Sequence, residues 1–159
     1  MNDNRISAAA YGGFVIGEFL KSNVWWMVLL LVVASVAAIY DYKFILVAFM
    51  IVLIVLPMIM SFVYFKYALH PLSRYSILPK VIEFDSREEA LALHILDVDD
   101  NITEFVRYKL SDFDAVSFGS SNVSFRYRLS RYTYLILPVK AFSQSEIEYL
   151  MNRFMPEIN

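Results

Sequence analysis

The chain has 159 residues, of which 58% are hydrophobic and 19% are charged, with a formal net charge of −2 and no cysteine. Soluble proteins contain roughly 45–50% apolar residues, so this excess favours an integral membrane protein with room for one small domain. The lack of cysteine excludes disulfides and thiolate chemistry, and the acidic balance disfavours nucleic-acid binding, which requires a basic surface.

Two apolar blocks, residues 24–40 and 44–65, contain no charged side chain. As helices rising 1.5 Å per residue they would span about 25 Å and about 33 Å, close to a hydrocarbon core of roughly 30 Å. The three intervening residues, 41–43, are too few to separate the helices. We therefore predict a transmembrane helical hairpin over residues 24–65, preceded by a cytoplasmic or interfacial segment, residues 1–23.

Small residues recur at helical spacing in the first part of the chain. Gly13 and Gly17 stand four apart, and Ala9 extends the pattern by one step. In lipid this spacing lets two helix backbones approach closely, so it indicates either a helix contact, including one within a homo-oligomer, or a short interfacial segment. Ala34 and Ala38 similarly give the first span a small-residue face that is predicted to pack against the second span.

Pro57 lies inside the second span and cannot donate an amide hydrogen bond, so a kink is predicted there. Neither span holds a charged side chain, which disfavours a transport pathway. Aromatic rings with a polar tip prefer the depth of the lipid headgroups. The predicted interface anchors are Trp25, Trp26, Tyr40, Tyr42, Tyr64 and Tyr67.

Basic residues near the spans predict the orientation. Arg5 and Lys21 precede the first span and Lys66 and Arg74 follow the second, whereas the turn offers only Lys43 beside an aspartate. An excess of basic residues marks the cytoplasmic side. The expected location is therefore the bacterial cytoplasmic membrane, as a multi-pass protein with both termini in the cytoplasm.

Residues 66–79 are predicted to form an extended linker, because His70 and Leu78 each precede a proline and such residues avoid the α region. A small domain over residues 80–159 follows. Residues 80–85 form a first strand, and a turn at residues 86–89 leads into a second, although Ser86 and Glu89 also have the spacing of a helix cap. The acidic stretch after residue 96 reads as a solvated turn, since it lacks the glycine and glutamate of a calcium loop.

Later strands show clean alternation. Val106, Tyr108 and Leu110 are predicted to face the core, opposite Arg107 and Lys109. The same pattern places Val123, Phe125, Tyr127 and Leu129 inside and Ser124, Arg126 and Arg128 outside. Residues 118–122 and 130–131 have the composition of turns.

Residues 132–137 are apolar or aromatic on both faces, which is typical of a central strand. Ser143 and Glu146 form a capping box that opens an amphipathic helix over residues 144–155. The predicted fold class is α+β, with a two-helix transmembrane hairpin, a small antiparallel β-meander domain and a C-terminal helix.

Residues 134–142 followed by the capped acidic helix at Ser143 and Glu146, together with the order of strands, resemble the YcxB-like family of small bacterial membrane proteins. The resemblance covers the chain from about residue 24 onward. It implies a membrane hairpin followed by a compact domain similar to pleckstrin-homology-like (PH-like) folds, and it implies a fold and a location rather than an activity.

No catalytic, cofactor or metal site is predicted. The two histidines, His70 and His94, lie outside any ligand spacing, and the sequence contains no phosphate-binding glycine loop or nucleophile motif. The protein is therefore not expected to be an enzyme.

Two functions are compatible with the sequence. In the first, the domain is a membrane-anchored cytoplasmic binding or scaffold module for a protein partner or for anionic lipid at the bilayer. Its candidate face would consist of Arg107, Lys109, Arg126 and Arg128 on one side of the sheet, unless these form an ordinary solvated surface. The alternative is a structural or protective subunit of a membrane complex that acts through its hairpin.

Overall fold

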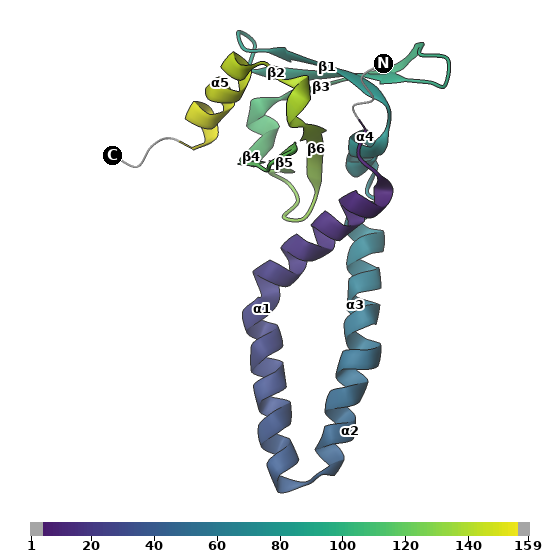
Figure 1. Cartoon of the computed structure of the whole chain (residues 1–159), viewed down its shortest axis with the longest axis vertical. Helices are drawn as coiled ribbons and strands as arrows, with labels where there is room; N and C mark the ends of the chain where they lie inside the picture. The colour runs from purple at the N-terminus through teal and green to yellow at the C-terminus, as the bar shows by residue number, and fades with distance from the viewer. Residues whose placement is uncertain (1–4, 156–159) are drawn as a thin grey trace.

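The computed structural model describes residues 5–155, which form an α+β chain (Figure 1). Two long apolar helices come first, and two antiparallel three-stranded sheets and a C-terminal helix follow. The helices project from one end of the β domain as an antiparallel pair (Figure 1). The predicted fold class is confirmed.

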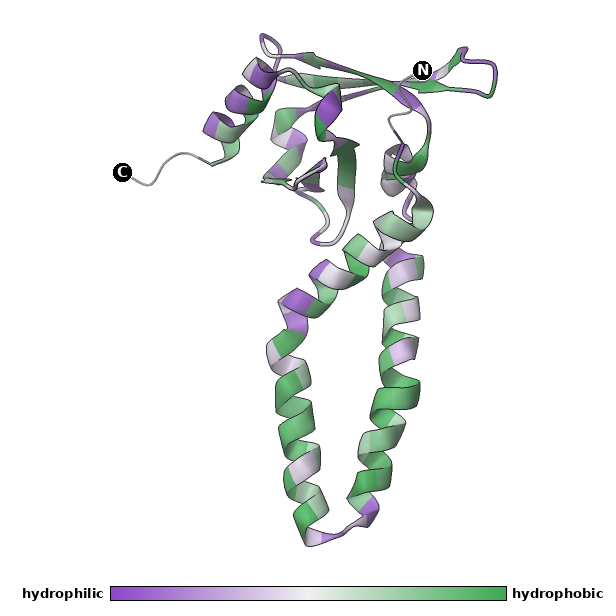
Figure 2. Ribbon diagram, viewed as in Figure 1, coloured by the Kyte–Doolittle hydropathy of each residue, from purple (hydrophilic) through white to green (hydrophobic). Residues whose placement is uncertain are grey.

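The first helix, α1 (Ala8–Tyr40), is continuous across the boundary expected at residue 23. Ser7 caps its start by accepting a hydrogen bond from the Ala10 amide. The first part of α1 runs obliquely beneath the domain before the helix turns away from it (Figure 1). Glu18 and Lys21 form an ion pair in this oblique part, whereas the remainder is almost entirely apolar (Figure 2).

The second apolar helix comprises α2 (Lys43–Met50) and α3 (Leu56–Val63), joined by a π-helical turn, Ile51–Val55, and followed by another, Tyr64–Ala68. The Leu56 amide bonds to the Ile51 carbonyl, five residues back. Pro57 comes directly after this wide turn, so the interruption predicted at the proline appears as a π-bulge in front of it. Both Ala8–Tyr40 and Lys43–Tyr67 are long and apolar enough to cross a membrane.

The segment between the helices and the domain is short and helical rather than extended, so that prediction was wrong. It forms a 3₁₀ turn, Pro71–Ser73, and then α4 (Arg74–Ile77). His70 and Leu78, which precede the prolines, do have extended backbones. Pro71 itself starts the helical turn, at a position where a missing amide hydrogen costs nothing.

The first sheet has the order β1 (Lys80–Asp85), β2 (Ala90–Leu96) and β3 (Ile102–Lys109). The predicted hairpin turn at residues 86–89 and the acidic turn after β2 are both present. Glu89 and Asp100 adopt left-handed backbones in these turns, with φ of 48° and 64°.

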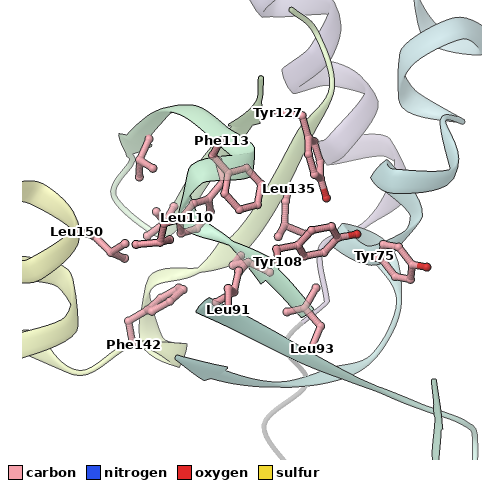
Figure 3. Packing of buried hydrophobic residues seen from close by; sticks show 14 of the residues in the cluster. Tyr75, Leu91, Leu93, Tyr108, Leu110, Phe113, Tyr127, Leu135, Phe142 and Leu150 are labelled. Atoms are coloured by element: carbon pink, nitrogen blue, oxygen red, sulfur yellow. The ribbon is translucent and has the colours of Figure 1, made fainter. Parts of the chain in front are cut away.

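The second sheet has the order β4 (Phe113–Phe118), β5 (Asn122–Tyr127) and β6 (Tyr134–Pro138). The C-terminal helix α5 (Gln144–Phe154) opens with the predicted Ser143–Glu146 capping box. Its Leu150 side chain, with both sheets and Phe142, closes the main core (Figure 3). The domain is thus held by one core shared between two small meanders.

Strand β6 is an edge strand and not the central strand that its composition predicted, since β5 is its only neighbour. Leu135 and Leu137 enter the main core. Tyr134 and Ile136, on the opposite face, pack against the start of α1 and the end of α3. The second face is therefore buried by helices from the other end of the chain.

The alternation predicted for β5 fails at two positions: Ser124, which was expected outside, is only 7% exposed, and Leu129 lies beyond the strand. β5 ends at Tyr127, and Leu129, which was expected inside, is 98% exposed in the turn before β6.

Close packing of α1 on the π-helical turn Tyr64–Ala68, which ends the second apolar helix, depends on Gly12 and not on the predicted pair of glycines. A Cβ atom at Gly12 would lie 2.5 Å from Cε2 of Tyr64, whereas one at Gly13 or Gly17 would meet no atom within 4 Å. Helix geometry turns these neighbouring glycines in different directions, and only Gly12 faces the second helix.

The variants Gly12→Ala and Gly13→Ala make a matched pair. We expect Gly13→Ala to be neutral or to stabilise the chain by up to about 1 kcal/mol, through the higher helix propensity of alanine. Gly12→Ala is expected to destabilise it by about 1–3 kcal/mol, because the methyl group overlaps the Tyr64 ring. Denaturation of the full chain in mild detergent measures both, and equal stability of the two variants would contradict the packing.

Candidate functional site

The four basic residues predicted to share a face lie on two different sheets. Arg107 and Lys109 belong to β3 in the first sheet, whereas Arg126 lies on β5 of the second and Arg128 follows that strand. The prediction of a single shared face is wrong because the domain's strands divide into two sheets between Lys109 and Phe113. Strand alternation does not reveal such a break.

Ion pairing further separates the four residues. Arg107 pairs with Glu88, and Arg126 makes a two-pronged contact with Asp114, with nitrogen–oxygen distances of 2.7 and 3.0 Å. The hydrogen bonds to Asp114 raise the pKa of Arg126. Arg128 takes part in no ion pair within residues 5–155. It is therefore the arginine of the three whose charge is available to a ligand.

The Tyr11 side chain of α1 joins the helices to the outer edge of β6. Its hydroxyl oxygen accepts the Tyr134 N–H at 3.3 Å, and the hydroxyl can donate to the Tyr134 carbonyl oxygen or to Ser73 Oγ, each 2.8 Å from the hydroxyl oxygen. Tyr11 is fully buried. A side chain thus occupies the place where a further strand would otherwise bond to this edge.

Ser76 of α4 completes the same edge. Its Oγ accepts the Ile136 N–H at 2.9 Å, and the side chain is fully buried. Three residues earlier, Ser73 Oγ donates to the Tyr67 carbonyl oxygen at 2.8 Å, at the end of the second apolar helix. Buried backbone groups of β6 are therefore satisfied by the segments that lead into and out of the hairpin, which holds the domain in one position over the helices.

Replacing Tyr11 by phenylalanine tests this connection. Tyr11→Phe keeps the packing but leaves the Tyr134 N–H and carbonyl group without the hydroxyl, which we expect to cost about 1–3 kcal/mol of stability. Tyr40→Phe, at an exposed tyrosine of the same helix, is the control and should change stability by less than about 0.5 kcal/mol. Denaturation of the full chain in detergent compares them, and similar stabilities would contradict a structural role for the hydroxyl.

The turn between β5 and β6 reaches the point where α1 becomes apolar. Arg131 Nη2 donates to Ser22 Oγ at 2.6 Å, and Asn23 Nδ2 donates to the Tyr132 hydroxyl at 3.1 Å. The Tyr132 ring also contacts the ring of Tyr67, with centroids 5.2 Å apart. This turn, which carries Leu129, therefore lies against the middle of α1, where its apolar part begins, and against the end of the second apolar helix (Figure 1).

A pocket of about 650 Å³ opens beside this turn. Its walls come from the segment after the second helix, from β3 and the turn that follows it, and from the turn after β5. The lining residues are His70, Leu72, Tyr108, Ser111, Asp112, Tyr127, Arg128, Leu129 and Ser130. The volume falls within the range of about 300–1,000 Å³ typical of small-molecule sites.

Two buried phenols line the pocket. Tyr108 and Tyr127 are 9% and 5% exposed, and neither hydroxyl makes a well-formed hydrogen bond within the described part of the chain, although the two hydroxyls lie close enough to interact with each other. Their oxygens lie on the same side of the core cluster, away from Phe142 and Leu150 (Figure 3). Burial raises the pKa of both hydroxyls, so both are neutral near pH 7 and able to donate. Unpaired buried donors are rare in proteins and call for an explanation.

The remaining polar groups of the pocket are partly committed. His70 Nδ1 accepts the Leu72 N–H at 3.2 Å, so the neutral ring carries its proton on Nε2. Asp112 Oδ2 accepts the Lys109 N–H at 2.9 Å. The pocket therefore presents several hydrogen-bond donors and one guanidinium against a single carboxylate that is already hydrogen-bonded.

The predicted interface anchors fall into two groups. Four of them are exposed: Trp25 and Trp26, which follow the α1 residues that contact the β5–β6 turn, and Tyr40 and Tyr42 at the hairpin turn. Tyr64 and Tyr67 are instead partly buried and pack with the cluster around Tyr11.

Sequence reasoning did not find the pocket. Tyr108 and Tyr127 were predicted as core residues, which they are, and the one available signal was a phenol at a position where phenylalanine would pack equally well. Among the described residues, no group of three His, Asp or Glu side chains gathers that could hold a metal ion. Comparison of the chain with protein families, curated proteins and solved structures yields no match.

Proposed function

We propose that the protein is a membrane-anchored binding module. The helical hairpin would span the bilayer, and the β domain would lie on the membrane surface at the end of the hairpin opposite the turn at residues 41–43. The order of hairpin, strands and capped final helix is the one that the resemblance to the YcxB-like family implies, and membership of that family stays a prediction.

The observation that carries this proposal is the position of the pocket. It lies beside the β5–β6 turn, whose Arg131 and Tyr132 contact Ser22 and Asn23, directly before the apolar part of α1. A ligand in the pocket would therefore be held at the membrane surface. The hydrogen bonds of Tyr11 and Ser76 to β6 support a fixed rather than a tethered domain.

The proposed orientation places both termini and the domain in the cytoplasm and the hairpin turn outside. It rests on the excess of basic residues at the domain end of the helices over the single Lys43 at the turn. The oblique part of α1, with its Glu18–Lys21 ion pair, would lie at the cytoplasmic surface and not within the hydrocarbon.

Cysteine accessibility tests the orientation, since the natural chain has no cysteine to interfere. Tyr42→Cys, at the hairpin turn, should react with a membrane-impermeant maleimide in intact cells. Val98→Cys, which is 100% exposed on the turn between β2 and β3, should react only after the cells are permeabilised. Labelling of Val98→Cys in intact cells would overturn the proposed orientation.

A second measurement tests whether the domain rests on the bilayer. Leu129→Cys carrying an environment-sensitive fluorophore should show a blue shift when the full chain moves from detergent-free denaturant into liposomes, because Leu129 projects beside the helix ends. Val98→Cys is the control: it is equally exposed, but its turn lies on the far side of the domain (Figure 1). Identical water-like spectra at both positions would contradict placement of the pocket at the surface.

The alternative, a structural subunit acting through its hairpin, is favoured by one observation. Gly13, Gly17 and Ala9 remain exposed on α1, with no atom near either glycine, and could receive another helix. Crosslinking of Gly17→Cys into a dimer within membranes would support a homo-oligomer of this kind.

A further inference from the structure

We propose that the pocket beside the β5–β6 turn binds the phosphate group of an anionic phospholipid headgroup. This inference rests on the proposed function and names the ligand class of its site. It is carried, among residues 5–155, by two buried hydroxyls that make no well-formed hydrogen bond and by an arginine that takes part in no ion pair, and all three line one cavity.

The chemistry of the lining calls for an anion with several acceptor oxygens. The Tyr108 and Tyr127 hydroxyls are buried donors that make no well-formed hydrogen bond to the described residues, and a ligand that accepts from them removes that cost. The Arg128 guanidinium matches the oxygens of a phosphate in a planar, two-pronged contact. A phosphate diester offers enough oxygens to satisfy all three.

The other charged groups of the pocket are compatible with such a ligand. His70 presents Nε2–H when neutral and adds a further donor. Asp112 is the opposing charge, but its carboxylate accepts the Lys109 N–H and lies beside the Arg128 backbone, whose N–H is bonded to the Asp112 carbonyl oxygen. The carboxylate is expected to disfavour ligands of high charge and to admit a singly charged diester.

Position favours a lipid over a soluble phosphate. His70 lies three positions after Tyr67, the last residue of the second candidate span, so the pocket opens at headgroup depth if the hairpin crosses the bilayer. Leu72 and the fully projecting Leu129 form the apolar part of the wall and rim. Acyl chains attached to a bound phosphate would pass these side chains and enter the surrounding lipid.

Native mass spectrometry of the full chain in mild detergent provides the test. Titration with phosphatidylglycerol should give a saturable one-to-one complex, and phosphatidylcholine should bind about tenfold more weakly. Arg128→Gln and the double variant Tyr108→Phe with Tyr127→Phe should each lower the affinity for phosphatidylglycerol about tenfold or more, through lost hydrogen bonds to a charged group. Glycerophosphoglycerol, the same singly charged diester without acyl chains, should bind at least as weakly as these variants bind the lipid.

The controls preserve the chemistry of each change away from the pocket. Arg87→Gln removes an exposed arginine from the β1–β2 turn, and Tyr149→Phe removes a hydroxyl of α5 that donates to Glu89. Both variants should bind the lipid like the natural chain. The tyrosine double variant should unfold at an unchanged temperature, since its hydroxyls make no well-formed hydrogen bond among residues 5–155. If it does not fold, Arg128→Gln alone decides, because Arg128 is exposed.

Three results would overturn the inference: unchanged lipid affinity in the pocket variants, equal binding of phosphatidylcholine, or glycerophosphoglycerol binding as tight as the lipid. Each is distinct from failure of the proposed function, since binding in detergent does not depend on orientation. Loss of lipid binding with correct labelling at Tyr42 and Leu129 would leave the anchored module standing and remove only this ligand.

Discussion

The arrangement of the molecule depends on how the outer edge of β6 is satisfied. An edge strand buried on both faces has backbone groups that neither water nor a further strand can reach, and each such group costs free energy if it is left unpaired. Here Tyr11, 123 residues away in sequence from Tyr134, supplies the missing partner, and Ser76 supplies another for Ile136. These hydroxyls make the entry and exit of the hairpin part of the domain's own structure.

This constraint explains the position of the pocket. With β6 held against α1 and α4, the turn before β6 lies beside the start of the apolar part of α1 and the end of the second apolar helix. There Tyr132 contacts Asn23 and Tyr67. The same placement brings His70 and Leu72 opposite Tyr127 and the residues that follow it. The pocket is thus formed jointly by the membrane-proximal segment and the β domain, and it would not exist in either part alone.

Electrostatics in the domain is local rather than global. From Lys80 onward the chain is acidic in balance, and Arg107 and Arg126 are already paired with carboxylates. A broad basic surface is therefore not present on these strands, and attraction to an anion would depend on a few donors that face one cavity. Hydrogen bonds in a partly enclosed site are stronger than those at an exposed surface, so a small number of groups can be sufficient.

Sequence by itself determined the features that depend on short-range patterns. Residue hydropathy located both apolar helices, and the alternation of apolar and polar residues located β3 and β5, which contain Tyr108 and Phe125. The Ser143–Glu146 capping box located the last helix. Only the tertiary structure decided that Gly12 and not Gly13 makes the close helix contact, that β6 is an edge covered by helices, and that the Tyr108 and Tyr127 hydroxyls make no well-formed hydrogen bond among residues 5–155. The reason is physical: periodicity reports which face of an element is buried, but the identity of what buries it comes from segments distant in the chain.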